Sequence, residues 1–317
     1  MTQGQAIREP ERLLMMAIEL DHAPEPVTEA VETLASAHLD RLVRLLDRAP
    51  PESSVARAAW GLAMRPETLR RLLDDESPDF ETLELLLARI GPDRADVLLD
   101  LLCESDSLAT RKRLLTRLVE LAPRIERELM RRSRDPRWYA RRNVLVLMGE
   151  LRRWPAKWSP APFVEDPHPA VRREALKLML KRPALRDRAL CGLLTDDDPR
   201  ARSLGLAAAT ESCPPEAVPL LADLVEKEGA PAEHRVLAIR ALGRSGEPAA
   251  VEPLLRVVRR GAGLAPNRLA EKSPVMVAGL QALATFPGDI GRGRKLLARA
   301  SRSRDSDIRG ALGREAP

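Results

Sequence analysis

Apolar residues recur along the chain at helical spacing, in stretches of about 10 to 17 residues separated by short groups of Pro, Gly or Asp. No stretch shows the alternation of apolar and polar residues that is typical of a half-buried strand. Many of the 27 prolines stand where such a stretch begins. Proline is tolerated there because the first-turn amides of a helix have no partner within the helix. The pattern predicts an all-α protein.

A second pattern is superimposed on the first. An arginine followed three and four residues later by small or apolar residues returns at intervals of 30, 31, 30 and 33 residues. Self-similarity at this period is typical of stacked helical repeats, so we expect an α-solenoid, a superhelix of antiparallel helix pairs similar to HEAT repeats. We name these residues the periodic arginines: Arg111, Arg141, Arg172, Arg202 and Arg235.

Each periodic arginine lies in the second helix of a predicted pair. These second helices are expected near 107–121, 136–152, 168–181, 198–210 and 231–244. First helices are expected near 92–103, 123–133, 183–194, 215–227 and 247–260. Earlier pairs, 39–48 with 52–64 and 66–75 with 79–90, fit the scheme, as do later second helices at 273–286 and 305–314. Two segments break it: 154–165 has room for only a stunted first helix, and 262–272 is an inserted loop.

Aspartates accompany three periodic arginines, each six residues before its arginine. With the segment ALGRSGEPAAVEPLLRVV at 241–258, this spacing resembles bacterial HEAT repeats of the phycobilisome-lyase-like type. The resemblance implies a ladder of charge pairs between neighbouring repeats and second helices that line the concave face. It does not imply lyase activity, because a fold does not define a function. We interpret the following residues as a structural ladder: Asp135, Arg141, Asp166, Arg172, Asp196 and Arg202.

The composition is that of one continuous solenoid over 1–317. The chain is 44% hydrophobic but only 3% aromatic, and Leu, Ala and Val suit closely spaced helices better than a β-sandwich. Charge divides it unevenly: 1–110 carry 11 Lys/Arg and 22 Asp/Glu, whereas 111–317 carry 41 and 25. An acidic N-terminal part and a basic remainder favour an anionic partner for the latter. They equally permit head-to-tail self-association.

Features of targeting and of catalysis are both scarce. Without a run of about 18 apolar residues or a secretory signal, we expect a cytoplasmic protein with no membrane span. Three cysteines without CxxC spacing fit a reducing compartment rather than a disulfide or zinc framework. The four histidines form no HExxH or similar metal motif, and no GxSxG, Walker A or GxGxxG motif occurs. We therefore expect no catalytic residue, cofactor or metal, and no enzyme.

Positions just after the periodic arginines are better candidates for binding. If the apolar positions face the core, the residues one and five places later lie on the flank that the resemblance assigns to the concave side. Lys112, Arg142 and Arg173 share the first row and Lys177 lies in the second. Repeats stack about 10 Å apart, which predicts a basic stripe. The alternative is a solvated face neutralised by local acids such as Glu174.

Aromatic residues concentrate near the first break. Five of the eight fall between 138 and 163, interleaved with arginines. Trp154 and Trp158, with Arg152 and Arg153, are candidate partner-binding residues, because such clusters anchor protein interfaces and also stack bases. The alternative is that the tryptophans fill the space left by the stunted helix. Trp138 lies on the core side of its helix and is expected to be structural.

These features leave three functions open. The leading hypothesis is a non-enzymatic scaffold or adaptor that binds another protein through its concave or tryptophan-rich surface. The second is a nucleic-acid-binding solenoid that uses the basic stripe. A remote third is a repeat-fold DNA glycosylase or bilin lyase, in which Trp138, Trp154 and Trp158 would line a cleft with Asp135 or Asp166. The sequence does not identify the partner.

Overall fold

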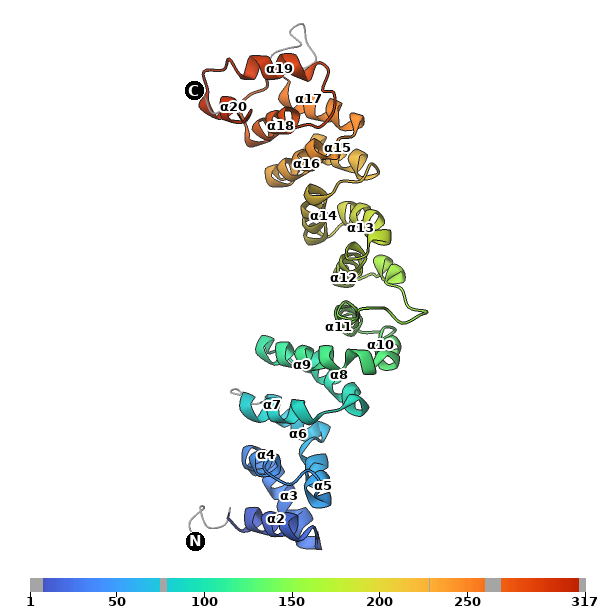
Figure 1. The fold of residues 1–317 in the computed structure, drawn as a ribbon, viewed down its shortest axis with the longest axis vertical. Coiled ribbons are helices and arrows are strands. Elements are labelled where there is room, and N and C mark those ends of the chain that lie inside the picture. Colours follow the sequence, from blue (N-terminus) through green and yellow to red (C-terminus); the bar gives the residue numbers. More distant parts are fainter. Residues whose placement is uncertain (1–7, 75–78, 228, 260–268, 314–317) are drawn as a thin grey trace. The chain divides into compact units, whose positions relative to one another are not determined.

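The computed structural model describes residues 8–74, 79–227, 229–259 and 269–313. Over these residues the chain is an α-solenoid of short helices, with a single isolated bridge between Arg259 and Leu269 in place of any β-strand. It divides into two compact units, residues 1–158 (unit 1) and 159–317 (unit 2), whose helices are labelled in Figure 1. We describe each unit by itself.

Unit 1 contains helices that pack in sequential pairs. Its second helices over the periodic arginines are α9 (Leu108–Leu121) and α11 (Trp138–Met148). The other elements are α2 (Arg8–Leu20), α3 (Glu25–Ala37), α4 (Leu39–Asp47), α5 (Ser54–Ala63), α6 (Pro66–Asp74), α7 (Phe80–Arg89), η1 (Pro92–Arg94), α8 (Ala95–Glu104), η2 (Ala122–Arg124) and α10 (Glu126–Arg132).

Unit 2 continues the alternation. Its second helices over the periodic arginines are α12 (Pro169–Leu180), α14 (Pro199–Glu211) and α16 (Ala232–Ser245). The other elements are η3 (Ala161–Glu165), α13 (Pro183–Thr195), α15 (Ala217–Glu226), η4 (Pro248–Ala250), α17 (Val251–Val258), α18 (Pro274–Ala284), α19 (Gly293–Ala300) and α20 (Ser306–Gly310). The helices predicted from 92 onward therefore exist, with ends shifted by a few residues.

The pairing expected near the N-terminus is reversed. Helix α4 packs on α7 and α3 packs on α5, so α4 lies in the row of second helices, where 39–48 was expected to be a first helix. Helices α2 and α3 were not predicted at all. They carry no periodic arginine, and only their apolar spacing marks them.

Small and unbranched residues allow the helices to stack closely. The buried side chains are mostly Leu, Ala and Val. At Gly243 in α16, a Cβ atom would lie 2.6 Å from the Cβ of Ala282 in α18, so only glycine permits this approach. Helix starts follow local chemistry as well: α14 begins at Pro199, and the Asp198 carboxylate accepts the Arg200 N–H at 3.1 Å.

The first predicted break is confirmed. Where a first helix would precede α12, the chain has no regular helix from 151 to 160 and then only the five-residue turn η3. Most of the second predicted break, 262–272, lies outside the described residues. Its last part is described: the Ala270 N–H donates to the carbonyl of Val258 at 2.7 Å and ties the chain back to α17.

Candidate functional site

Four of the five periodic arginines close the turn that precedes their second helix, whereas Arg235 donates to the Val225 carbonyl of the preceding helix at 2.8 Å. In three of them the guanidinium donates to the main-chain carbonyl oxygen of the aspartate six residues earlier. The Nη1-to-oxygen distances are 2.9 Å from Arg141 to Asp135, 3.1 Å from Arg172 to Asp166 and 3.2 Å from Arg202 to Asp196. A planar guanidinium suits this use because it presents several fixed donors to clustered carbonyls. These arginines therefore act on the backbone of their own repeat.

The aspartate side chains complete the same turn. Each carboxylate accepts the N–H two residues later, at 2.9 Å from Arg137, 2.9 Å from His168 and 2.8 Å from Asp198. Asp196 is only 9% exposed, so its carboxylate depends on these partners. The turn also exists where serine replaces aspartate, from Arg111 to Ser105 (3.2 Å) and from Arg309 to Ser303 (2.8 Å). The predicted ladder contained only aspartates, so it did not include the serine versions of the turn.

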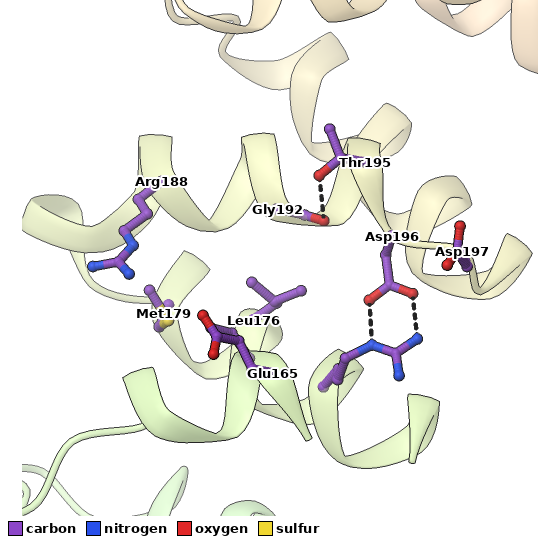
Figure 2. Close-up of a pocket in the computed structure, with 10 residues that line it drawn as sticks. Glu165, Leu176, Met179, Arg188, Gly192, Thr195, Asp196 and Asp197 are labelled. Carbon is purple, nitrogen blue, oxygen red and sulfur yellow. Dashed lines mark hydrogen bonds and ion pairs between the residues drawn. The ribbon is translucent and has the colours of Figure 1, made fainter. Parts of the chain in front are cut away.

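Charge pairs also join one helix to another within each unit. The Arg172 guanidinium binds Asp196 through two hydrogen bonds of 2.9 Å. Figure 2 draws both bonds as dashed lines at the labelled Asp196. This bidentate contact lowers the pKa of the Asp196 carboxyl. In unit 1, Arg132 binds Asp100 in the same manner, at 2.5 and 2.9 Å. The hydrogen bond from Arg137 lowers the pKa of Asp135 to about 2.

The four residues of the expected basic stripe have different surroundings. Lys112 in α9 and Arg142 in α11 belong to unit 1, whereas Arg173 and Lys177 in α12 belong to unit 2. Arg173 forms an ion pair with Asp198, and Lys177 lies 3.7 Å from the carboxylate of Glu174. The unit 2 half of the row is thus neutralised by its own acids. Lys112 is exposed and has no ion-pair partner among the described residues.

The N-terminal ends of α9 and α11 expose large apolar side chains. Leu108 is 75% exposed and Trp138 is 40% exposed. Both stand three residues before a periodic arginine, where α12 and α14 have Pro169 and Pro199. The expectation that Trp138 lies on the core side of its helix is therefore wrong, and its structural role stays a prediction. It is the first residue of α11, and the buried part of the helix starts two residues later, at Ala140.

The tryptophans of the first break contact one another. Trp154 and Trp158 are half-buried, with ring centroids 5.4 Å apart in an edge-to-face arrangement at 77°. They lie in the irregular segment between α11 and η3, beside the exposed Arg152 and Arg153. The pair has the geometry of a stable aromatic contact.

A cavity of about 480 Å³ lies in unit 2 between η3, α12 and α13, beside the stunted first helix (Figure 2). Its wall combines the Arg172–Asp196 pair with Leu176, Met179 and the exposed Arg188. The lining residues include no His, Cys, Lys or Ser, and the Thr195 hydroxyl donates to a carbonyl of its own helix at 3.0 Å. The wall therefore holds no nucleophile paired with a base.

Metal binding and membrane insertion both require recognisable groups of side chains or long apolar helices. No group of three or more His, Cys, Asp or Glu side chains there is arranged to hold a metal ion. None of the helices in the described part of the chain has the length and apolar character needed to cross a bilayer.

Comparison with known proteins supports the repeat class. Residues 187–264, which begin within α13 and include α14 to α17, match the family model for HEAT repeats. This match covers part of unit 2 and agrees with the helical repeats that the arginine spacing predicts. Among solved structures, one titled "Crystal structure of She4p" is similar at 13% identity and a TM-score of 0.33. The match covers 95% of this chain but only 59% of that one. A search of curated proteins finds no match.

Proposed function

We propose that the protein is a non-enzymatic HEAT-repeat scaffold or adaptor that binds another protein. The observation that carries this proposal is the distribution of exposed apolar side chains. Among the described residues, every large apolar side chain that is exposed lies in unit 1: Leu13, Met15, Met16, Leu20, Leu108 and Trp138. Four of the six belong to the single helix α2, and exposed apolar patches are typical of protein–protein contact sites.

The candidate acids and bases along the chain support binding rather than catalysis. Groups that could act as acids or bases have structural bonds instead: the His168 imidazole accepts the Ala170 N–H at 3.3 Å and begins α12. The Asp135 and Asp166 carboxylates, which a glycosylase mechanism would need, accept N–H groups in their own turns. We therefore do not propose the glycosylase or bilin lyase alternative.

The proposal includes four more specific expectations from the sequence. They are a bacterial repeat of the phycobilisome-lyase-like type, a cytoplasmic location, a concave binding face and a partner contact made by Trp154 and Trp158. Support for the last is that the exposed Arg152 and Arg153 directly precede the half-buried aromatic pair, since Trp and Arg are the residue types enriched in interface anchors.

Nucleic-acid binding has less support. Several of the cations between 111 and 182 are paired with acids of the protein itself, and each such pair lowers the charge that could replace counterions on a phosphate backbone. Pairs of this kind are Arg131 with Glu128, Arg132 with Asp100, Arg137 with Asp135, Arg173 with Asp198 and Lys177 with Glu174.

The test is affinity capture from the native lysate by the full-length chain, with and without nuclease, compared with two variants. One variant replaces Trp154 and Trp158 with alanine; the other replaces Leu108 and Trp138 with serine. We expect protein partners that persist after nuclease treatment and in about 0.3 M salt, and that at least one variant loses. Capture that nuclease abolishes, or that is identical for all three proteins, would contradict the proposal. Thermal unfolding of each variant shows that it is folded.

A further inference from the structure

Two neighbouring second helices of unit 1 present the same combination of side chains. Counting from the periodic arginine, position −3 is Leu108 in α9 and Trp138 in α11, and position +1 is Lys112 and Arg142. Residues four apart lie one turn apart on the same side of a helix. Helices α9 and α11 pack against each other (Figure 1). We name these four residues the α9/α11 face.

The α9/α11 face carries positive charge without acids of its own. No Asp or Glu occurs between Ser107 and Val119 or between Pro136 and Gly149. The other cations of α9 are engaged: Arg111 with the Ser105 carbonyl at 3.2 Å, Arg113 with Glu84 at 2.9 Å and Arg117 with Glu120 at 2.7 Å. Lys112 remains exposed, with no carboxylate at ion-pair distance among the described residues.

The same positions in α12 and α14 of unit 2 have neither a large apolar side chain nor an unpaired lysine. Position −3 is proline in α12 and α14, and position +1 in α12 is Arg173, which is paired with Asp198. In α14, position +1 is Ser203, whose hydroxyl lies 3.1 Å from the imidazole of His234 in α16. The stacking of repeats therefore does not require a large apolar side chain at position −3, nor an exposed lysine without an ion-pair partner among the described residues, such as Lys112, at position +1. Stacking alone does not account for Leu108, Trp138 and Lys112.

We propose that the α9/α11 face binds a protein segment that carries large apolar side chains next to carboxylates. This inference rests on the proposed scaffold function and names the chemistry of its partner. The apolar side chains cover Leu108 and Trp138, and the carboxylates meet Lys112 and Arg142 one helical turn, about 5 Å, farther along. Neighbouring helices lie about 10 Å apart, which an extended segment spans with about three residues. The expected motif is two apolar residues about three positions apart, each beside an Asp or Glu.

The division of labour between the two kinds of side chain follows from their exposure. Leu108 and Trp138 gain most from being covered, because burial of apolar surface supplies most of the affinity at an interface. Lys112 and Arg142 lie at the rim of such a contact, where complementary charge selects the partner and speeds association. A neutral apolar segment would bind more weakly, and a basic one would be repelled.

The experiment is selection of a displayed random-peptide library against the purified full-length chain, followed by fluorescence anisotropy with the enriched peptide. We expect a consensus of two large apolar residues with adjacent acids. Relative to the unmodified chain, Trp138→Ser should weaken binding at least about tenfold and Lys112→Ala about threefold, as expected for an anchor and a rim charge. Leu108→Ser should weaken it about fivefold.

Matched controls lie elsewhere in the same unit. Leu20 in α2 is 73% exposed, nearly the same as Leu108, so Leu20→Ser removes an equally exposed leucine away from the face. Arg127 in α10 is exposed and has no ion-pair partner among the described residues, so Arg127→Ala is the control for Lys112→Ala. Both controls should change the affinity less than about twofold.

Several results would overturn the inference. They are a neutral or basic consensus, no enriched peptide, binding that survives Trp138→Ser, or loss of binding with Leu20→Ser but not with Leu108→Ser. Self-association of the unmodified chain that Trp138→Ser abolishes would make a second copy the occupant and would also refute it. The lysate capture separates this failure from that of the scaffold proposal. Partners that are lost when Trp154 and Trp158 are replaced, but kept when Leu108 and Trp138 are replaced, would support the scaffold proposal and refute only the α9/α11 face.

Discussion

The second helices of unit 1 and unit 2 share the arginine turn and its charge pairs, which we call the frame, and present different surfaces. In both units an arginine donates to the carbonyl six residues earlier, at 2.9 Å in α11 and 3.2 Å in α14. Beside that arginine, unit 1 exposes Leu108 and Trp138, whereas α12 and α14 of unit 2 have prolines at the same positions. Stacking therefore determines the arginine and its turn, and the positions on either side vary independently of it.

This comparison assigns stability and binding to different residues. The frame depends on carboxylates such as Asp196, which are buried and bonded within the repeat. The α9/α11 face depends on side chains that contribute little to folding. Four predictions test whether stability and binding depend on different residues.

The largest expected effect is on the frame of unit 2. Asp196→Ala leaves the Arg172 guanidinium without its bidentate partner and removes an acceptor from the turn, so we expect a loss of about 3 kcal/mol in the free energy of unfolding. The measurement is urea unfolding followed by circular dichroism. Asp197→Ala is the control, because Asp197 is exposed, and it should cost less than about 0.5 kcal/mol. Equal losses for the two variants would show that the ladder is not structural.

The second prediction concerns acid. The hydrogen bond from Arg137 lowers the pKa of Asp135 to about 2, and Arg132 lowers that of Asp100. The unfolded chain then binds protons at a higher pH than the folded one. The stability that these pairs contribute is therefore complete above about pH 4 and is lost as the pH falls towards 2.

The expected loss from Asp135 alone is about 2 kcal/mol, at roughly 1.4 kcal/mol for each pKa unit. Urea unfolding at a series of pH values measures it. The Asp135→Asn variant should be less stable at pH 7 and should show a shallower decline between pH 4 and pH 2. A variant whose stability falls as steeply as that of the unmodified chain would show that Asp135 is not the group that titrates.

The third prediction concerns the ion pair between Arg173 and Asp198 in unit 2. Asp198→Ser retains a side chain that can accept the Arg200 N–H but removes the carboxylate paired with Arg173. Because the pair is partly exposed, we expect a loss of less than about 1 kcal/mol. Urea unfolding measures this loss. The enriched peptide should still not bind to α12, because Pro169 stands where the α9/α11 face has an apolar anchor. A loss of several kcal/mol would mean that the pair belongs to the frame.

The smallest expected effect is at the anchor itself. Leu108→Ala should change the free energy of unfolding by less than about 0.5 kcal/mol, because the side chain is exposed and leaves no cavity. Leu118→Ala on the same helix should cost about 3 kcal/mol, because Leu118 is fully buried. Thermal and urea unfolding compare them. A costly Leu108→Ala would make Leu108 a packing residue and weaken the assignment of the face.

The sequence predicted the frame better than the surface. The period of the arginines determined the second helices from α9 to α16, because stacking repeats the same contact in each unit. Helices α2 and α3 were not predicted, since the predicted pairs began at residue 39. The exposure of Trp138 also escaped it, since helical spacing does not show where the buried part of a helix begins.

Ion pairs between helices were equally hidden from the sequence. Arg173 and Lys112 occupy the same position in the repeat, yet Asp198, which neutralises Arg173, belongs to the turn before the next second helix. Such a pairing depends on how two repeats meet in space. The cavity of Figure 2 was foreseen only as a break in the pattern, because its wall is formed by three separate elements.

Hydrogen–deuterium exchange of the full-length chain, with and without the enriched acidic peptide, tests the central claim most directly. The account predicts slower exchange in 107–121 and 137–149 when the peptide binds, and no change in 168–181 or 198–211. Protection confined to the unit 2 segments, or none in α9 and α11 at a saturating peptide concentration, would contradict it.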